Sequence, residues 1–329
     1  AAGKIDVDYK NRNISGGISM NKVLISILEL FGGIEAAVSD LKTNDSTFAL
    51  PVRFHNYGLL GTRLKLNKIR FEVSASSQFV HEKNNNGIRA KDRFRLNPFV
   101  SITGNPMNNK LIYEIWYRNS FRMPTFNELY YNNIGNNLLE PEDAHQLNAG
   151  LAYLPWNKRL KVKLKANGFY NRVDNKIVAI PTTNLFVWSM QNIGKTDVFG
   201  SEGVLSIDWQ FHPKWKFSSD GNYSFQKTID VTDRNSPTYG DQIAYIPLHT
   251  ANLDVAVYFQ KTGLRISSNF VSERYALNEN IEANKIDGFI IADVSIFHQF
   301  LLKRTNSLQV QLNVKNVFNN SYAYIRSFA

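Results

Sequence analysis

The stretch LKVKLKANGFY, residues 160–170, alternates apolar side chains with basic or polar ones at a period of two. Leu160, Val162 and Leu164 share one side of the pattern. Three lysines share the other side: Lys161, Lys163 and Lys165. Successive side chains of a β-strand point to opposite faces, so this predicts a strand with one apolar and one polar face. Because the alternation recurs in LQVQLNVKN from residue 308, LSIDWQF from 205, IRFEVSAS from 69 and LRISSNF from 264, we predict an all-β chain.

Short turn signals and long polar connections alternate between these strands. Most of the short signals contain Pro, Gly or Asn: LNK near 67, GNPMNN at 104–109, PWNK at 155–158, HPK at 212–214, QKTG at 260–263 and KRTN at 303–306. Longer polar connections are expected at about 83–91, 123–140, 181–196, 230–244 and 278–286. The sheet should therefore have short turns at one end and long loops at the other, as outer-membrane β-barrels have.

Aromatic side chains gather next to the short turns. They are Tyr153, Trp156, Phe211, Trp215, Phe259 and Phe300. An interfacial aromatic belt predicts this placement, and the strands reach the roughly 9–11 residues that cross a bilayer. A soluble β-sandwich or propeller would also show the alternation, although a propeller carries four short strands in each repeat of about 40–50 residues. We therefore favour an antiparallel transmembrane β-barrel in the outer membrane of a Gram-negative bacterium, in contact with its lipid.

The composition excludes several classes of function. The chain has no cysteine, which removes disulfides, thiolate zinc sites and cysteine nucleophiles. Its net charge is +10, which favours an anionic partner such as lipopolysaccharide or an acidic ligand. The basic residues are spread along the chain, so nucleic acid is not expected. No catalytic motif stands out and the six histidines are scattered, so we predict no enzyme, no cofactor and no metal site.

The most apolar run is VLISILELFGGIEAAV, residues 23–38. It contains Glu29 and Glu35, and it is too short and too charged for a membrane-spanning helix. A strand with a bulge and a short helix both fit this run.

The segment SFRMPTFNELYYNNIGNNLLEPEDA, residues 120–144, resembles the signature region of TonB-dependent outer-membrane receptors. In that family an F-R-x-P-T-x-x-E-L-Y-like sequence ends one strand, and N-x-x-L-x-P-E opens the next. The first part is matched by Phe121, Arg122, Pro124, Thr125, Glu128, Leu129 and Tyr130, and the second by Asn136, Leu139, Pro141 and Glu142. The ending LNVKNVFNNSYAYIRSF is similar to the family's last-but-one strand and the loop after it, at Asn313, Asn316, Phe318 and Tyr322. The resemblance covers roughly residues 45 to 329.

The resemblance implies a 22-stranded barrel around a plug, energised by a TonB protein of the inner membrane. Residues 1–329 then form an incomplete segment of that barrel, with 13 or 14 clear strands, with residues 1–45 loosely assigned and the plug and the final strand absent. The family's ligands are scarce, bulky nutrients. Residues 125–141 contain no histidine, which argues against haem, and the motif is most like that of cobalamin and ferric-siderophore receptors. The expected partners are therefore the TonB complex, reached through the missing plug, and cobalamin or a small-molecule metal chelate.

Two sets of residues are candidates for the site. The expected ligand contacts offer rings, amides or charges on the loops: Arg122, Asn127, Glu128, Tyr130, Tyr131, Phe186, Trp188, Gln191, Tyr239 and Tyr245. Arg122 and Glu128 could instead pair with each other and only order the loop. The expected lumen-facing cations are Lys161, Lys163, Lys165 and Arg265. A passive porin, a lipid-transport barrel and a soluble carbohydrate-binding β protein are the alternatives.

Overall fold

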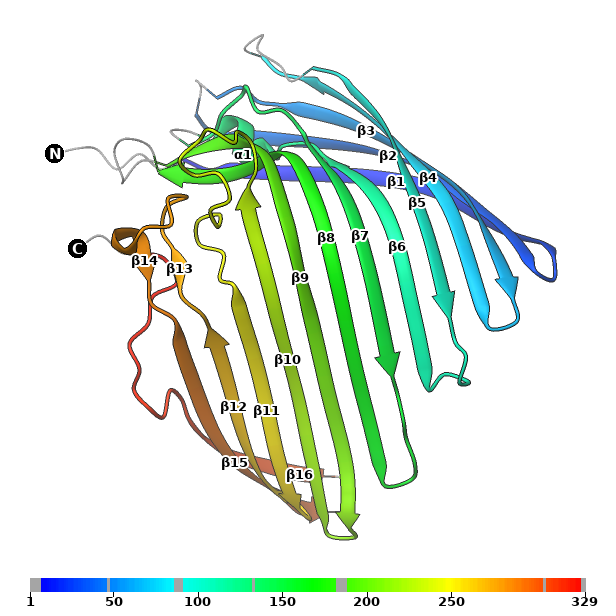
Figure 1. Cartoon of the computed structure of the whole chain (residues 1–329), viewed down its shortest axis with the longest axis vertical. Helices are drawn as coiled ribbons and strands as arrows, with labels where there is room; N and C mark the ends of the chain where they lie inside the picture. The colour runs from blue at the N-terminus through cyan, green and yellow to red at the C-terminus, as the bar shows by residue number, and fades with distance from the viewer. Residues whose placement is uncertain are drawn as a thin grey trace. The chain divides into compact units, whose positions relative to one another are not determined.

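The computed structural model describes residues 7–45, 48–85, 91–131, 134–181, 188–303 and 306–326. In this part of the chain fourteen strands form one sheet, in which successive strands of the chain are neighbours except that β12 pairs with β15 (Figure 1). The strands are antiparallel. Their bounds are β1 Tyr9–Ile25, β2 Leu28–Thr43, β3 Val52–Leu66, β4 Ile69–Lys83, β5 Arg93–Gly104, β6 Leu111–Arg122, β7 Glu142–Tyr153, β8 Leu160–Pro181, β9 Trp188–His212, β10 Trp215–Asp230, β11 His249–Phe259, β12 Thr262–Val271, β15 Phe289–Lys303 and β16 Asn306–Val314. The all-β prediction and the expected strand number are confirmed.

The remaining elements are short and belong to the long loops. A small second sheet pairs β13, Arg274–Tyr275, with β14, Lys285–Ile286. The helices are α1, Phe126–Tyr130, and the 3₁₀ helix η1, Glu282–Asn284. Within the described ranges, no helix is long and apolar enough to span a membrane.

The predicted short turns join the strands at one end of each hairpin, and Arg304 and Thr305 of the turn predicted at 303–306 lie outside the described residues. Asn67 follows β3 with φ of 50°, and Gln260 follows β11 with φ of 55°. These left-handed residues match the twist that tight hairpins require. The run at 23–38 is neither a single bulged strand nor a helix, because β1 ends at Ile25 and β2 begins at Leu28. An irregularity in pairing does occur between Val23 and Ile25.

Three predicted connections have clearly different bounds in the structure. The one expected at 230–244 extends to residue 248, because β10 ends at Asp230 and β11 begins at His249. The one expected at 181–196 is shorter, because β9 begins at Trp188. The one expected at 278–286 is longer, since β12 ends at Val271 and β15 begins at Phe289, with β13, η1 and β14 between them. The connection at 123–140 contains α1.

The chain divides into two compact units. The first comprises Ala1–Ile102, Trp116–Leu147 and Arg172–Thr196. The second comprises Thr103–Ile115, Asn148–Asn171 and Asp197–Ala329. In the first unit the buried apolar residues gather where the loop between β6 and β7 folds back over the strands.

The apolar faces of the strands are exposed in both units. In the first, Ile18 on β1 and its register partner Ile34 on β2 are 77% and 69% exposed. In the second, Val310 on β16 is 55% exposed, and Val162 and Ile207 are half-buried. A soluble sandwich would bury these side chains against a second sheet. Rows of exposed aliphatic residues on long strands are what a bilayer-facing sheet requires.

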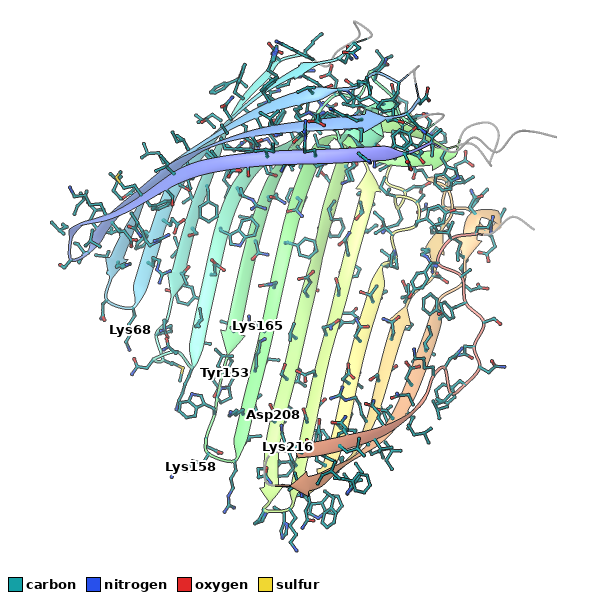
Figure 2. The ribbon with its side chains drawn as sticks, turned by 180° about the vertical axis from the view of Figure 1, so that it is seen from behind. Lys68, Tyr153, Lys158, Lys165, Asp208 and Lys216 are labelled. Atoms are coloured by element: carbon teal, nitrogen blue, oxygen red, sulfur yellow. The ribbon has the colours of Figure 1, made fainter. Side chains whose placement is uncertain are left out.

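Several charged residues lie on the polar faces of the strands. On β8, Lys161, Lys163 and Lys165 alternate with the apolar side chains and are exposed, and Lys165 is labelled in Figure 2. Between β9 and β10, Lys216 Nζ pairs with Asp208 Oδ1 at 2.5 Å (Figure 2). Arg265 on β12 is also exposed.

Candidate functional site

The loop between β6 and β7 is built around a capped helical turn. Pro124 has no N–H to continue the β-ladder, which ends β6 at Arg122. Thr125 then forms a capping box with Glu128. The Glu128 amide donates to Thr125 Oγ1 at 3.2 Å, and the Thr125 amide donates to Glu128 Oε2 at 2.7 Å. The sequence TFNE therefore starts α1 by satisfying two backbone donors that the helix itself cannot satisfy.

Arg122 joins this loop to the start of β7. Its Nη1 donates to Glu128 Oε2 at 2.9 Å, so the two residues pair with each other, which is one of the arrangements that the sequence left open. Its Nε and Nη2 also bind both carboxylate oxygens of Glu142 at 2.9 Å. Glu142 Oε1 further accepts from the Ile177 amide at 2.8 Å. One guanidinium thus holds two carboxylates from the two halves of the motif, in the bidentate geometry that arginine favours.

The ionisation of Glu128 follows from these contacts. Partial burial alone would disfavour the carboxylate form of Glu128. The hydrogen bonds from Arg122 and Thr125 outweigh this desolvation, so the pKa of Glu128 lies below its ordinary value. The cluster therefore contains ionised Glu128 at neutral pH.

The apolar side of α1 packs on residues of β2 and β3. Phe126 lies in a buried cluster with Leu41 and Phe48. The Arg53 guanidinium lies 4.7 Å from the centroid of the Phe126 ring. Leu41 and Arg53 belong to the side of these strands opposite the exposed Ile34, so α1 covers the polar side of the sheet within the first unit.

Tyr130 fixes the end of α1 to a buried ion pair. Arg53 and Glu82 are both buried and lie 2.7 Å apart. The Tyr130 hydroxyl donates to the other oxygen of Glu82. Burial, together with this carboxylate, raises the pKa of Tyr130. This network joins β3, β4 and α1. Arg53 and Glu82 were not predicted from the sequence, because they lie far from the motif along the chain.

The other expected contacts of the first unit are less enclosed. Asn127 and Tyr131 are exposed, and the Tyr131 ring centroid lies 5.3 Å from that of Tyr9. Gln191 is exposed and Trp188 is half-buried, but both belong to β9 rather than to the expected loop. Phe186 lies outside the described residues.

In the second unit, the loop after β10 is joined to the loop after β12 by amides. Asn280 Nδ2 donates to the Gln242 carbonyl at 2.9 Å, and Asn280 Oδ1 accepts from the Gln242 amide at 2.6 Å. Asn278 Oδ1 accepts from the Ala244 amide at 2.9 Å. These amide side chains form hydrogen bonds with backbone groups of the other loop, in the place where a β-ladder would have backbone groups on both sides.

The two expected tyrosines of the second unit differ in burial. Tyr239 is exposed. Tyr245 is half-buried with φ of 62°, and its amide donates to the Tyr275 carbonyl at 2.7 Å. Burial raises the pKa of Tyr245. Tyr239 is therefore the more accessible of the two.

Arginines hold the segment after β16 onto the same loops. Arg274 Nη2 donates to the Tyr324 carbonyl at 3.0 Å and also to that of Ala323. Arg326 donates to the Ala283 and Lys285 carbonyls at 2.9 and 3.0 Å. A pocket of about 450 Å³ lies beside these contacts, lined by Lys285, Ile286, Asp287, Gly288, Phe289, Ser321, Tyr322, Ala323 and Arg326. No sequence pattern points to these arginines, because they bind backbone carbonyls rather than acids.

The chain matches a family model described as "TonB dependent receptor-like, beta-barrel" over residues 38–317. It is 22% identical to the Vitamin B12 transporter BtuB of Vibrio vulnificus (strain YJ016) over 215 residues, which are 61% of this chain and 29% of that protein. Its fold is similar to that of the Copper transporter OprC, with a TM-score of 0.72 and 15% identity, covering 96% of this chain and 52% of that one. The FrpB iron transporter from Neisseria meningitidis, F5-1 variant in its apoprotein form, has a TM-score of 0.71 at 15% identity, covering 97% and 54%.

The family model matches most of the chain, so the chain belongs to the TonB-dependent receptor family and forms part of its β-barrel. Barrels of this family lie in the outer membrane of Gram-negative bacteria. The chain spans less than a third of the length of the curated relative and about half the length of these solved structures.

Proposed function

We propose that the full-length protein takes up cobalamin across the outer membrane, with energy delivered by a TonB protein through a plug domain. The observation that carries this proposal is the family match over residues 38–317 on a sheet whose apolar face is exposed. The cobalamin assignment is supported by the named function of the 22% identical relative and by the form of the motif at residues 121–130. A ferric siderophore is the second candidate ligand, because the motif resembles those receptors equally.

The contacts inside the first unit divide the candidate residues into two roles. Arg122, Glu128 and Tyr130 have internal ionic or hydrogen-bonding partners, so we assign them to positioning the loop. Asn127 and Tyr131 are exposed on the same loop and are the proposed ligand contacts there. Trp188 and Gln191 on β9 are further candidate ligand contacts in the first unit. Tyr239 and Tyr245 are candidate ligand contacts in the second unit.

Uptake by cells lacking the complete gene tests the function. Radiolabelled cobalamin and ferric siderophores are supplied separately; cobalamin should enter cells that carry the wild-type gene, and a TonB deletion should abolish that entry. Tyr131→Ala should lower cobalamin uptake at limiting concentrations, whereas Tyr153→Ala is a matched control at a short turn, since both residues are 41% exposed.

Each result has a distinct consequence. Unchanged uptake of both ligands after deletion of the gene would overturn the transport proposal. Loss of ferric-siderophore uptake alone would replace cobalamin by the second ligand. Uptake that persists without TonB would favour a passive barrel. Equal effects of the two tyrosine substitutions would remove Tyr131 from the proposed contacts.

The polar face of β8 gives a separate test of the lumen. We propose that Lys161, Lys163, Lys165 and Arg265 face the lumen, where they would attract anionic groups. The chain has no native cysteine, so single cysteines can be introduced cleanly. In outer membranes, Lys163→Cys should react with a water-soluble maleimide and Leu164→Cys should not. Equal labelling would contradict an aqueous face beside a lipid face.

A further inference from the structure

A cation occupies the same position at four successive short turns of the second unit. In each case it is the last residue before the strand that follows the turn. These residues, which we call the basic rim, are Lys110 before β6, Arg159 before β8, Lys214 before β10 and Lys261 before β12. All four are exposed, and Lys158 on the turn of Arg159 is labelled in Figure 2. Lys68 holds the equivalent position before β4 in the first unit, so the positive charge recurs with the hairpin.

Backbone hydrogen bonds align the basic rim along the short-turn end of the second unit. The carbonyl of each rim residue accepts from an amide of the next hairpin. The pairs, with the donor first, are Leu154 and Lys110 at 2.7 Å, Gln210 and Arg159 at 2.7 Å, Gln260 and Lys214 at 2.8 Å, and Gln299 and Lys261 at 2.9 Å. Successive hairpins are two strand spacings apart, so neighbouring rim cations are separated by roughly 10 Å.

The basic rim has few acidic residues near it. The stretches 104–113, 153–163, 209–219, 257–265 and 297–303 contain ten lysines and arginines and no aspartate or glutamate. Asp208 lies just outside these stretches and is paired with Lys216. Among the residues that the structure describes, no salt bridge involves a rim cation. The described part of the chain therefore leaves the charge of the rim available to an external anion.

The basic rim lies on the turn side of the aromatic belt. Trp215 directly follows Lys214, and its ring centroid lies 4.7 Å from that of Phe259, two residues before Lys261. Aromatic rings in this position mark the membrane–water interface of an outer-membrane barrel, and the short turns of such a barrel face the periplasm. The rim cations therefore meet the periplasm rather than the hydrocarbon.

The surroundings of the rim favour a carboxylate-bearing glycan over a folded protein. The centre of a protein–protein interface is depleted in charged residues, especially lysine, whereas each of these turns ends in a cation. The same turns expose the amides of Asn108 and Gln260, and Trp156, which is 68% exposed. Amides bind hydroxyl groups, and an amphipathic ring packs on the apolar face of a sugar. Repeated point charges also suit a polymer whose anions recur, because one exposed ion pair alone is weak.

We propose that the basic rim docks the receptor onto the peptidoglycan of the cell wall. This polymer joins sugar chains to short peptides with free carboxylates, so it presents anions and sugar rings together. The ammonium and guanidinium groups of the rim pair with those carboxylates, and several weak pairs on one scaffold add up to a stable contact. The inference rests on the membrane location and is independent of the transported ligand.

Co-sedimentation with purified peptidoglycan sacculi tests this proposal. The full-length receptor is reconstituted in nanodiscs of zwitterionic lipid, and the sacculi are first treated with protease to remove attached proteins. The wild type should pellet with the sacculi, and added salt should release it, because exposed charge pairs are screened. Sacculi with amidated carboxylates should not retain the wild type, and this arm requires no variant. Lys110→Gln, Arg159→Gln, Lys214→Gln and Lys261→Gln combined should weaken binding roughly 30-fold, or about 2.3-fold for each exposed cation.

A matched variant separates the rim from general charge effects. Lys10→Gln, Lys42→Gln, Lys83→Gln and Arg234→Gln combined remove the same charge from exposed residues at the long-loop end and should pellet as the wild type does. Equal binding by the two quadruple variants, or equal retention on amidated sacculi, would overturn the proposal.

The remaining outcomes identify a different occupant. Capture that requires sacculi without protease treatment would assign the rim to an attached acidic protein. If the wild type does not pellet from zwitterionic nanodiscs, the peptidoglycan contact is rejected and the rim is left to the phosphates of the inner leaflet.

Discussion

The loop after β6 and the loops after β10 and β12 are ordered by different interactions. In the first unit, Arg122 holds the carboxylates of Glu128 and Glu142, and Phe126 adds apolar burial. In the second, Asn280 and Gln242 exchange neutral hydrogen bonds with each other's loop. The first loop should therefore respond to charge and pH, whereas the amide contacts of the second should be indifferent to both.

The largest effect is expected from Arg122→Ala. It leaves Glu128 and Glu142 without their shared cation in a partly enclosed site. We expect the loop at residues 123–141 to lose about 2–3 kcal/mol of local stability, because unpaired carboxylates keep their desolvation cost. Hydrogen exchange of the full-length receptor measures this as faster amide exchange confined to that loop.

Arg118→Ala is the control for Arg122→Ala. Arg118 donates to Gln146 at 2.8 Å and 3.0 Å on the neighbouring part of the same strands, where Arg118 is exposed and Gln146 is half-buried. Its removal should leave exchange at 123–141 unchanged. Equal responses to the two substitutions would mean that the ion cluster does not order the loop.

Acidification should give the next largest effect. The pKa of Glu128 is lowered in the folded state from its ordinary 4.5, so its contribution to stability is present above about pH 4.5 and is lost as the pH falls through the folded value. Exchange at 123–141, corrected for its intrinsic pH dependence, should therefore increase below pH 4.5. Glu128→Gln keeps the shape without titrating and should show a smaller response. An equal response in Glu128→Gln would assign the pH dependence elsewhere.

The smallest effect is expected in the second unit. Asn280→Ala removes two hydrogen bonds between Asn280 and Gln242 and should cost about 1–2 kcal/mol of local stability. Hydrogen exchange should increase at residues 241–246 and 278–288, by the same factor at pH 4 and pH 7. Tyr239→Ala, on the same loop but exposed, is the control. Protection that survives Asn280→Ala would show that backbone contacts alone hold these loops.

The sequence predicts the strands well where alternation and turn chemistry agree. β8 and β16 follow their alternating patterns directly. The hairpin at 23–38 was not predicted because its turn, at residues 26–27, is Ser-Ile and carries no Gly, Asn or Pro. The start of β9 at Trp188 was also missed, since strand pairing uses the backbone and polar side chains can continue a ladder.

The candidate site was predictable only in its local part. The pairing of Arg122 with Glu128 follows from a spacing of a few residues. The second partner, Glu142, and the Arg53–Glu82 pair under Tyr130 lie farther along the chain or on other strands. Such contacts depend on strand register, which one sequence does not specify across a long sheet.

Every strand of the large sheet pairs with the strands next to it in the sequence, apart from the short insertion of β13 and β14 between β12 and β15. A hairpin could therefore be added to or removed from such a sheet without changing the order in which the other strands pair. Assembly can proceed hairpin by hairpin along the growing edge, with little entropy lost in closing long loops. The number of strands in such a sheet can change during evolution in steps of two. The loops at the outer end of the sheet can diversify independently.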